Sequence, residues 1–213
     1  MSGGLHVLGA GGHAKVIVEL AQAAGWRVAG IYDDGYLNHP GVLGHAVIGA
    51  LADVPDKPGV QAVIAIGGNR VRFLLDRRFK ALDWVTLVHP FSWISPTVHL
   101  EPGAVVMAGA VIHADAHIGR HVIVNTSASV DHDCSLGNYV HIAPGCHLAG
   151  DVTISDGSFL GAGTTVIPGC TVGEWSIVGA GAVVARTLPA NVTAVGAPAK
   201  PIKEREPGWH EET

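Results

Sequence analysis

The chain has 213 residues, of which 48% are hydrophobic and 15% charged, and its net charge is −5. These values exclude an intrinsically disordered chain, and the scarcity of Lys and Arg argues against a nucleic-acid partner. Because the sequence has no apolar run of 18 residues, no signal-peptide pattern and too few cysteines for a disulfide framework, we expect a cytoplasmic protein without membrane insertion.

The first 88 residues read as strands alternating with helices, the pattern of a parallel α/β sheet. "LHVLGA" at 5–10 predicts a buried strand, and "GGHAKVIVELAQAAG" at 11–25 predicts a turn followed by a helix. The Gly- and Pro-rich segment 35–60 gives no clear signal. The other expected elements are a strand at 27–34 ending in two aspartates, a strand at 62–67, a helix at 69–83 and a short strand at 85–90.

A glycine-rich loop joins the first strand to the first helix. "GAGGHA" at 9–14 fits the pattern G-x-G-x-x-A, and Asp33 and Asp34 follow at the end of the second strand. In dinucleotide-binding folds such glycines admit a phosphate to the helix N-terminus, and the acidic residue binds ribose. An NAD-dependent dehydrogenase is one interpretation, although the first half is too short for two mononucleotide-binding units. A single-nucleotide site and a purely structural turn are the others.

A six-residue period begins at Ile94. Every sixth residue from there to Val184 is Ile, Leu or Val, without interruption. Hexapeptide periodicity predicts a β-helix in which each hexad forms one side of a triangular coil, so the run holds about five coils of eighteen residues. The corner positions are mostly Gly or Asp, which tolerate a left-handed backbone. All three cysteines occupy a small interior position, which predicts reduced, buried thiols.

One coil carries an unusual triplet in "SVDHDCSLG" (129–137). A spacing of eighteen places His132 between Ala114 and Gly150, and it is the only histidine at its position in the repeat. A solvated surface histidine is the plain alternative. Asp133 occupies a corner position, so a turn residue is its alternative, and we interpret Asp131 as structural. A zinc site that combines His132 with other histidines of the repeat is a weaker interpretation, because the spacing does not match known ligand sets.

The sequence resembles a known enzyme family in both halves. The hexapeptide repeat is similar to the left-handed β-helix acyltransferases, trimers that bind acetyl-CoA between neighbouring helices. "VNTSASVDHDCSLGNYVHIAPGCHLAGDV" (124–152) resembles the nucleotide-sugar N-acetyltransferases of the bacillosamine and perosamine type, and sialic acid O-acetyltransferase-like proteins share this motif. "GAGGHAK", "IYDD", "VIG" and "AIGGNR" resemble their N-terminal nucleotide-sugar domain. We therefore expect a small Rossmann-like α/β domain over 1–88, a left-handed parallel β-helix over 89–188 and a C-terminal cap over 189–213.

The resemblance also implies roles for individual residues. His132 matches the general base, Asp133 the carboxylate that orients its imidazole, and Gly150 a glycine whose N–H faces the thioester oxygen. The positions that match acetyl-CoA contacts are Asn125, His141 and Ala162, with the segment 196–200 matching less securely. The implied nucleotide-sugar contacts lie in the glycine-rich loop and at the ends of the second and third strands: Gly9, Gly11, Gly12, His13, Asp33, Asp34, Gly67 and Asn69.

This family implies an acetyl-CoA-dependent N-acetyltransferase that acts on a nucleotide-linked amino sugar, such as GDP-perosamine or a UDP-linked 4-amino sugar. The amine must lose a proton when it attacks the thioester, and a histidine with its pKa near pH 7 can accept that proton. We expect direct transfer in a homotrimer, without a metal and without a covalent acyl-enzyme. O-acetylation of a sialic acid-type sugar and a non-catalytic β-helix scaffold are the alternatives.

Overall fold

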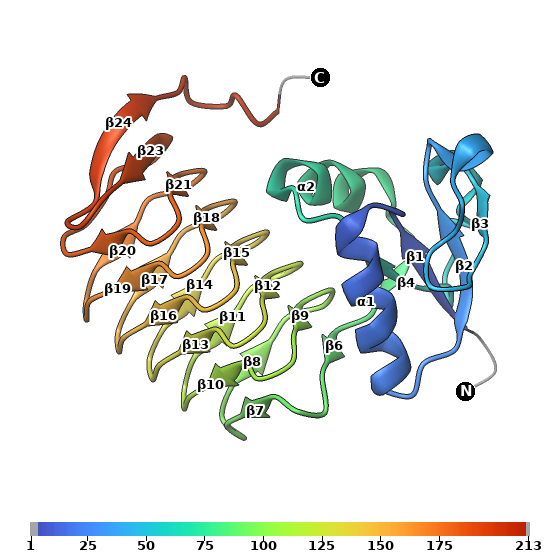
Figure 1. The fold of residues 1–213 in the computed structure, drawn as a ribbon, viewed down its shortest axis with the longest axis horizontal. Helices are drawn as coiled ribbons and strands as arrows, with labels where there is room; N and C mark the ends of the chain where they lie inside the picture. Colours follow the sequence, from blue (N-terminus) through green and yellow to red (C-terminus); the bar gives the residue numbers. More distant parts are fainter. Residues whose placement is uncertain (1–3, 212–213) are drawn as a thin grey trace.

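The computed structural model describes residues 4–211, which form an α/β half and a β-solenoid half (Figure 1). The α/β half contains one parallel sheet with the strand order β3-β2-β1-β4-β5. The predicted fold class, an α/β domain followed by a left-handed β-helix, is confirmed. The elements of the first half are β1 (Leu5–Leu8), α1 (Gly12–Ala23), β2 (Val28–Tyr32), η1 (Tyr36–Asn38), β3 (Val47–Gly49), η2 (Leu51–Asp53), β4 (Gln61–Ile64), α2 (Asn69–Arg78) and β5 (Asp83–Trp84).

The solenoid consists of two-residue strands followed by two longer strands at its C-terminal end. They are β6 (Leu87–Val88), β7 (Trp93–Ile94), β8 (His99–Leu100), β9 (Val105–Val106), β10 (Val111–Ile112), β11 (His117–Ile118), β12 (Ile123–Val124), β13 (Ser129–Val130), β14 (Ser135–Leu136), β15 (His141–Ile142), β16 (His147–Leu148), β17 (Thr153–Ile154), β18 (Phe159–Leu160), β19 (Thr165–Val166), β20 (Thr171–Val172), β21 (Ile177–Val178), β22 (Val183–Val184), β23 (Val192–Val195) and β24 (Lys200–Glu204).

These strands stack into three faces of a triangular coil. The eight-stranded face has the order β24-β23-β21-β18-β15-β12-β9-β6, the six-stranded face β22-β19-β16-β13-β10-β7, and the five-stranded face β20-β17-β14-β11-β8. Equivalent residues pair at a spacing of eighteen, as Val124 with Ile142. The predicted register of the repeat is therefore confirmed.

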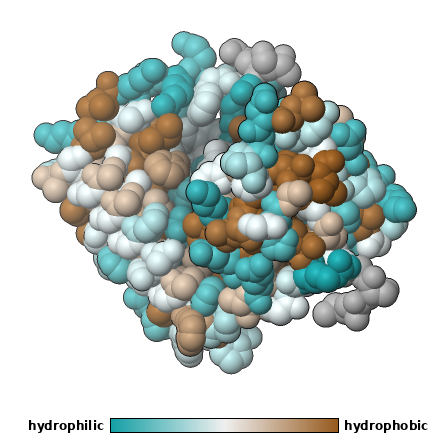
Figure 2. Space-filling view, turned by 45° about the vertical axis from the view of Figure 1, so that its right-hand side comes forward, coloured by the Kyte–Doolittle hydropathy of each residue, from teal (hydrophilic) through white to brown (hydrophobic). Residues whose placement is uncertain are grey.

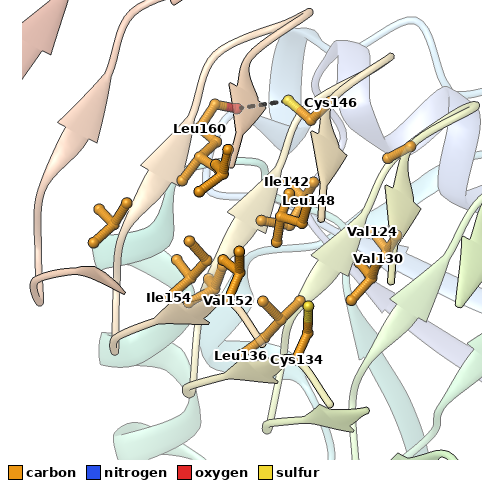
Figure 3. Close-up of a cluster of buried hydrophobic side chains, with 14 of the residues drawn as sticks. Val124, Val130, Cys134, Leu136, Ile142, Cys146, Leu148, Val152, Ile154 and Leu160 are labelled. Atoms are coloured by element: carbon orange, nitrogen blue, oxygen red, sulfur yellow. Dashed lines mark hydrogen bonds between the residues drawn. The ribbon is translucent and has the colours of Figure 1, made fainter. Parts of the chain in front are cut away.

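The interior of the solenoid is filled by the residues of the six-residue period. Every sixth residue from Val106 to Val184 is buried, and the small residues between them pack against these aliphatic side chains (Figure 3). The cysteines are free and buried, as the sequence predicts, and the Cys146 thiol donates to the carbonyl oxygen of Gly161 at 3.1 Å. Apolar burial of this kind, at about 25 cal/mol per Å², stabilises the coil along its whole length.

One corner column departs from the expected glycine and aspartate pattern. His121, Tyr139 and Trp175 have positive φ angles of 53°, 60° and 51° although they are bulky. Such residues rarely adopt the left-handed region, so their surroundings must hold them there. Here the α/β domain provides that support, since the ring of Phe73 on α2 contacts the rings of Tyr139 and Trp175 edge-on.

The junction between the halves differs in detail from the expected elements. The helix expected at 69–83 ends at Arg78, and β5 follows it in the sheet. The strand expected at 85–90 contains β6, which pairs with β9 and so begins the solenoid one side before Ile94. At the other end, β23 continues the eight-stranded face beside β21, and β24 pairs with β23 antiparallel.

Helix α1 packs against the outer side of the eight-stranded face. Ile17 and Val18 of this helix share a buried cluster with Leu87, Val105 and Ile123 of the solenoid. This apolar contact fixes the glycine-rich loop, which precedes α1, beside that face. On the surface, apolar residues form patches separated by polar ones (Figure 2). Within residues 4–211, every helix is too short or too polar to cross a membrane.

Candidate functional site

His132 and Asp133 lie at the edge between the six-stranded and five-stranded faces, between β13 and β14. The Nδ1 atom of His132 is 2.7 Å from Oδ2 of Asp133, and the two side chains are 61% and 59% exposed. The Asp131 carboxylate accepts a hydrogen bond from the His132 backbone N–H. The hydrogen bond to Asp133, assisted by the charge of Asp131, raises the pKa of His132. With Nδ1–H held by Asp133, the neutral ring carries its lone pair on Nε2, which faces solvent and can accept a proton.

Gly150 covers the His132 ring from the next coil. The backbone N–H groups of Asp133 and Asp151 donate to the carbonyl oxygens of Ala114 and His132, which places His132 between Ala114 and Gly150 as the sequence predicts. A Cβ atom built on Gly150 would lie 2.6 Å from Cε1 of His132, so only glycine leaves room for this ring. Among the described residues, no protein acceptor hydrogen-bonds to the Gly150 N–H. Gly150 itself is buried beside the imidazole.

A second cluster lies on the eight-stranded face around His141, whose side chain is buried on β15. Its Nδ1–H donates to the carbonyl oxygen of Gly67 at 3.1 Å, and its Nε2 atom accepts from the Asn125 side-chain amide at 3.1 Å. The Thr126 backbone N–H donates to Oδ1 of Asn125, which orients that amide. Burial, with a contribution from Arg72, lowers the pKa of His141 to about 3. His141 is therefore neutral at neutral pH, and its two partners fix one tautomer.

The glycine-rich loop lies beside this cluster. The rings of His13 and His141 have centroids 6.1 Å apart, and burial lowers the pKa of His13 to about 4. The Nε2 atom of His13 is buried without a hydrogen-bond partner among the described residues. Gly9 has φ +110°, and a Cβ there would lie 2.5 Å from the Ile66 side chain, so this position requires glycine. By contrast, a Cβ on Gly11 would meet nothing within 4 Å, which leaves the N-terminus of α1 open.

The other predicted residues of the loop region are partly engaged with the protein itself. Gly12 is the first residue of α1, and its surroundings are as open as those of Gly11. The Asp33 carboxylate accepts the backbone N–H groups of Ala10 and Gly35, both at 2.9 Å. Asp34 accepts the Leu51 N–H at 3.0 Å. These bonds hold the loops around the α1 N-terminus, and contact of either aspartate with a nucleotide stays a prediction.

Asn69 joins the α/β domain to the solenoid. Its side-chain amide donates to the carbonyl oxygens of Gly157 and Ser158 at 2.9 and 3.0 Å. Gly67 and Asn69 also border a cavity of about 330 Å³ between α2, the solenoid and the C-terminal segment. Sequence reasoning could not find the aromatic residues that line this cavity, because they are distant from one another in the chain: Phe159, Trp175 and Trp209.

Sequence reasoning also missed Arg72, which is only 1% exposed. Its guanidinium donates to the carbonyl oxygens of Gly67 at 2.8 Å, Tyr139 at 2.7 Å and His121 at 3.0 Å. Burial lowers the pKa of Arg72 to about 9, so it remains charged at neutral pH. Arg72 therefore holds the loop at Gly67 against the aromatic corner column. The signal available in the sequence was the bulky residues at corner positions, because such residues need a neighbour that packs against them.

The predicted site is divided between two edges of one chain. The cluster on the eight-stranded face contains Gly67, His13, His141 and Asn125. His132 and its partners lie at the far edge of the six-stranded face. The segment 196–200 connects β23 and β24, and Ala162 is an exposed corner residue whose carbonyl oxygen accepts from the Gly181 N–H. Neither position contacts the His132 side chain among the interactions of residues 4–211.

Comparisons with known proteins match both halves. Residues 4–77 match the family model described as PglD N-terminal domain, and residues 151–186 match bacterial transferase hexapeptide (six repeats). The chain is 42% identical over 111 residues to UDP-N-acetylbacillosamine N-acetyltransferase of Bacillus subtilis (strain 168), covering 48% of this chain and 50% of that protein. It is 28% identical over 79 residues to GDP-perosamine N-acetyltransferase of Escherichia coli O157:H7, covering 36% of each. The matched segments thus span at most half of these curated relatives.

Solved structures match over almost the whole chain. A variant of perosamine N-acetyltransferase from Caulobacter crescentus, in complex with CoA and GDP-perosamine, is 43% identical with a TM-score of 0.91, and the match covers 96% of this chain and 99% of that one. The acetyltransferase domain of PglB from Neisseria gonorrhoeae FA1090, in complex with acetyl coenzyme A, is 38% identical with a TM-score of 0.88. That match covers 93% of this chain and 98% of the domain.

Proposed function

This chain belongs to the nucleotide-sugar N-acetyltransferases of the left-handed β-helix superfamily, and on that premise we propose that it acetylates the amine of a nucleotide-linked amino sugar with acetyl-CoA. The observation that carries this proposal is the His132–Asp133 pair packed beneath Gly150. The pair combines an oriented base with an N–H, one coil away, that has no hydrogen-bond acceptor among the described residues. The substrate class is supported by the similar structure that holds CoA and GDP-perosamine together.

In the proposed reaction, the sugar amine attacks the thioester carbonyl carbon and loses a proton to Nε2 of His132. Asp133 stabilises the resulting imidazolium through the hydrogen bond at Nδ1. The Gly150 N–H would stabilise the oxyanion of the tetrahedral intermediate, a type of contact that contributes about 10²–10³-fold to rate. Collapse breaks the carbon–sulfur bond, and the coenzyme thiolate takes the proton from His132. A new amide and free CoA are the products.

The residues that we assign to the two substrates adjoin one another at the hydrogen bond between His141 and Gly67. We assign Asn125, His141 and Ala162, with the segment 196–200, to the acetyl-CoA side. The nucleotide diphosphate would bind at the open N-terminus of α1, where Gly11 and Gly12 leave space and the helix dipole favours negative charge. Gly9 shapes that loop. The remaining assigned nucleotide-sugar contacts surround it: His13, Asp33, Asp34, Gly67 and Asn69.

A homotrimer would complete the divided site. In one chain the glycine-rich loop and His132 lie beside different edges of the coil, so a nucleotide sugar bound at the loop needs His132 of another copy. A contact between these two different edges is heterologous and closes into a ring when repeated around an axis. The six-stranded face lies between the two edges and would face that axis. Acetyl-CoA would then bind between neighbouring copies.

The direct test of the reaction is thiol release from acetyl-CoA by the purified protein. The acceptors are UDP-, GDP- and dTDP-linked 4-amino sugars, with sialic acid as a hydroxyl acceptor. We expect turnover with one nucleotide-linked amino sugar and a product heavier by one acetyl group on nitrogen. Turnover with the hydroxyl acceptor alone would replace this proposal with O-acetylation. No thiol release with any acceptor would contradict it.

A further inference from the structure

We propose that His99, Glu101 and His117 form a binding site for a divalent transition-metal ion, with Zn²⁺ as the ion that suits it best. The three residues lie on the five-stranded face, where His99 begins β8 and His117 begins β11. These strands pair in parallel with His117 directly opposite His99, so both imidazoles point out from neighbouring coils. The hexapeptide register, rather than chance proximity of loops, therefore brings the two rings together.

The ligand atoms of the three side chains already converge. One nitrogen or oxygen atom from each residue lies within 4.8 Å of the others. The rings of His99 and His117 stack with centroids 5.2 Å apart and an interplanar angle of 10°, and Nε2 of His99 is 2.9 Å from Oε1 of Glu101. Around a tetrahedral zinc ion with Zn–N bonds of about 2.0–2.1 Å, ligand atoms are about 3.3 Å apart. Small side-chain rotations close the difference, because both histidines are exposed.

The chemistry of the donors favours zinc over harder cations. Two imidazoles and one carboxylate form a set used by Zn²⁺ with three protein ligands and one position left for water. Mg²⁺ and Ca²⁺ prefer oxygen ligands alone. Among the described residues, Glu101 has an ion pair with His99 and none with a Lys or Arg. The next outward positions of this face are Ser135 and Thr153, so no neighbouring charge in the column opposes a cation.

The position of this cluster suggests what a bound ion would do. Strand β8 is the edge strand of the five-stranded face, in which the described residues pair it with β11 alone. Edge strands have an unpaired side and open more readily than central strands. A metal ion held by His99 and Glu101 on one coil and His117 on the next would link the first two coils. Binding to the folded state alone raises the melting temperature.

The cluster is separate from the residues assigned to acetyl transfer. His132 lies at the edge of the same five-stranded face, just before β14, which pairs with β11, but it is not among the three ligand residues, and the glycine-rich loop packs on the eight-stranded face. The test therefore measures zinc binding itself and needs no substrate.

The experiment titrates the full chain with ZnCl₂ by isothermal calorimetry, with MgCl₂ in a parallel titration. We expect one zinc site per chain that His117→Ala and Glu101→Gln each weaken by at least about tenfold, as losses of metal-site groups do. His113→Ala removes an exposed histidine outside the cluster and should bind zinc as the unmodified chain does. Circular dichroism establishes that the variants are folded, since the altered side chains are exposed or half-buried.

Melting temperature supplies a second measurement. A hundredfold excess of zinc over its dissociation constant should raise the melting temperature of the unmodified chain and of His113→Ala equally, and raise that of His117→Ala clearly less. The proposal is overturned if zinc binds His117→Ala as tightly as the unmodified chain. It is equally overturned if no zinc binding occurs, or if Mg²⁺ binds as tightly as Zn²⁺.

Discussion

His141 Nδ1–H donates a hydrogen bond to the carbonyl oxygen of Gly67 across 74 positions of the sequence. Arg72 donates to the same oxygen at 2.8 Å, and Asn125 donates to the other nitrogen of the His141 ring. The loop after β4 is thus tied to the eight-stranded face through the neutral side chain of His141. This links the residues assigned to the nucleotide sugar with those assigned to the coenzyme.

The buried histidines predict how stability depends on pH. The folded-state pKa values of His13 and His141 are about 4 and about 3, below the value of about 6.5 for an unfolded chain. Below pH 6.5 the unfolded chain binds protons that the folded chain does not, so the free energy of unfolding falls as the pH drops toward 4. Urea unfolding at pH 7.5 and pH 5.0 measures this difference. His141→Gln should reduce it and His113→Ala should not; an equal difference in His141→Gln would contradict the burial argument.

The helix N-terminus predicts a variant that folds well and loses one substrate. Gly11 is the N-cap of α1, and a Cβ there meets nothing within 4 Å. Aspartate is a favourable N-cap, so Gly11→Asp should keep or slightly raise the melting temperature. Its carboxylate would repel the diphosphate and weaken nucleotide-sugar binding. Calorimetry with the nucleotide sugar and with CoA measures both sites.

The matched control for that variant is Gly11→Ser, which supplies an uncharged N-cap at the same place. It should weaken nucleotide-sugar binding much less than Gly11→Asp, while neither variant changes CoA binding. Equal affinity of the two variants for the nucleotide sugar would mean that the diphosphate does not bind at the α1 N-terminus.

Asp133 predicts a shift in the pH dependence of acetyl transfer. Its hydrogen bond is the main cause of the raised His132 pKa. In Asp133→Asn that pKa falls, so the ring is unprotonated at lower pH and the acid limb of the rate profile moves to lower pH. The plateau rate should also fall, because the amide holds the imidazolium less well than the carboxylate. A profile with an unmoved acid limb would make Asp133 a corner residue without a role in the reaction.

Gly150→Ala tests the packing above the His132 ring. The added Cβ would lie 2.6 Å from Cε1 and 2.7 Å from Nε2 of His132, so the ring must move. A displacement of this size predicts a rate loss of about 10²-fold. The double variant with His132→Ala shows whether this rate loss acts through the His132 ring, because Gly150→Ala should add little further rate loss once that ring is absent. An additional loss as large as in the unmodified chain would mean that Gly150 acts independently of His132.

The six-residue period predicted more than the coil itself. Because parallel strands pair at a constant spacing of eighteen, simple counting placed Gly150 above His132. The period carries no information about what packs outside the coil, so the contacts of Arg72 and Asn69 with the solenoid were not predictable. Tyr139 was a signal in hindsight, because a tyrosine at a corner position needs a neighbour that holds its left-handed backbone.

The divided site leads to a complementation measurement. His132→Ala alone should lose about 10²–10⁴-fold in acetyl transfer, the usual contribution of a general base, while CoA still binds. Gly11→Asp alone should lose nucleotide-sugar binding. Co-expression of the two variants produces mixed oligomers in which His132 from one chain can meet an intact glycine-rich loop of another.

We expect mixed oligomers to recover a substantial part of the thiol-release rate, whereas the two variants purified separately stay inactive. Different affinity tags on the two variants, purified in sequence, ensure that only mixed oligomers are assayed. Mixed oligomers as inactive as their parents would contradict a site shared between chains, and full activity of His132→Ala alone would remove His132 from the reaction.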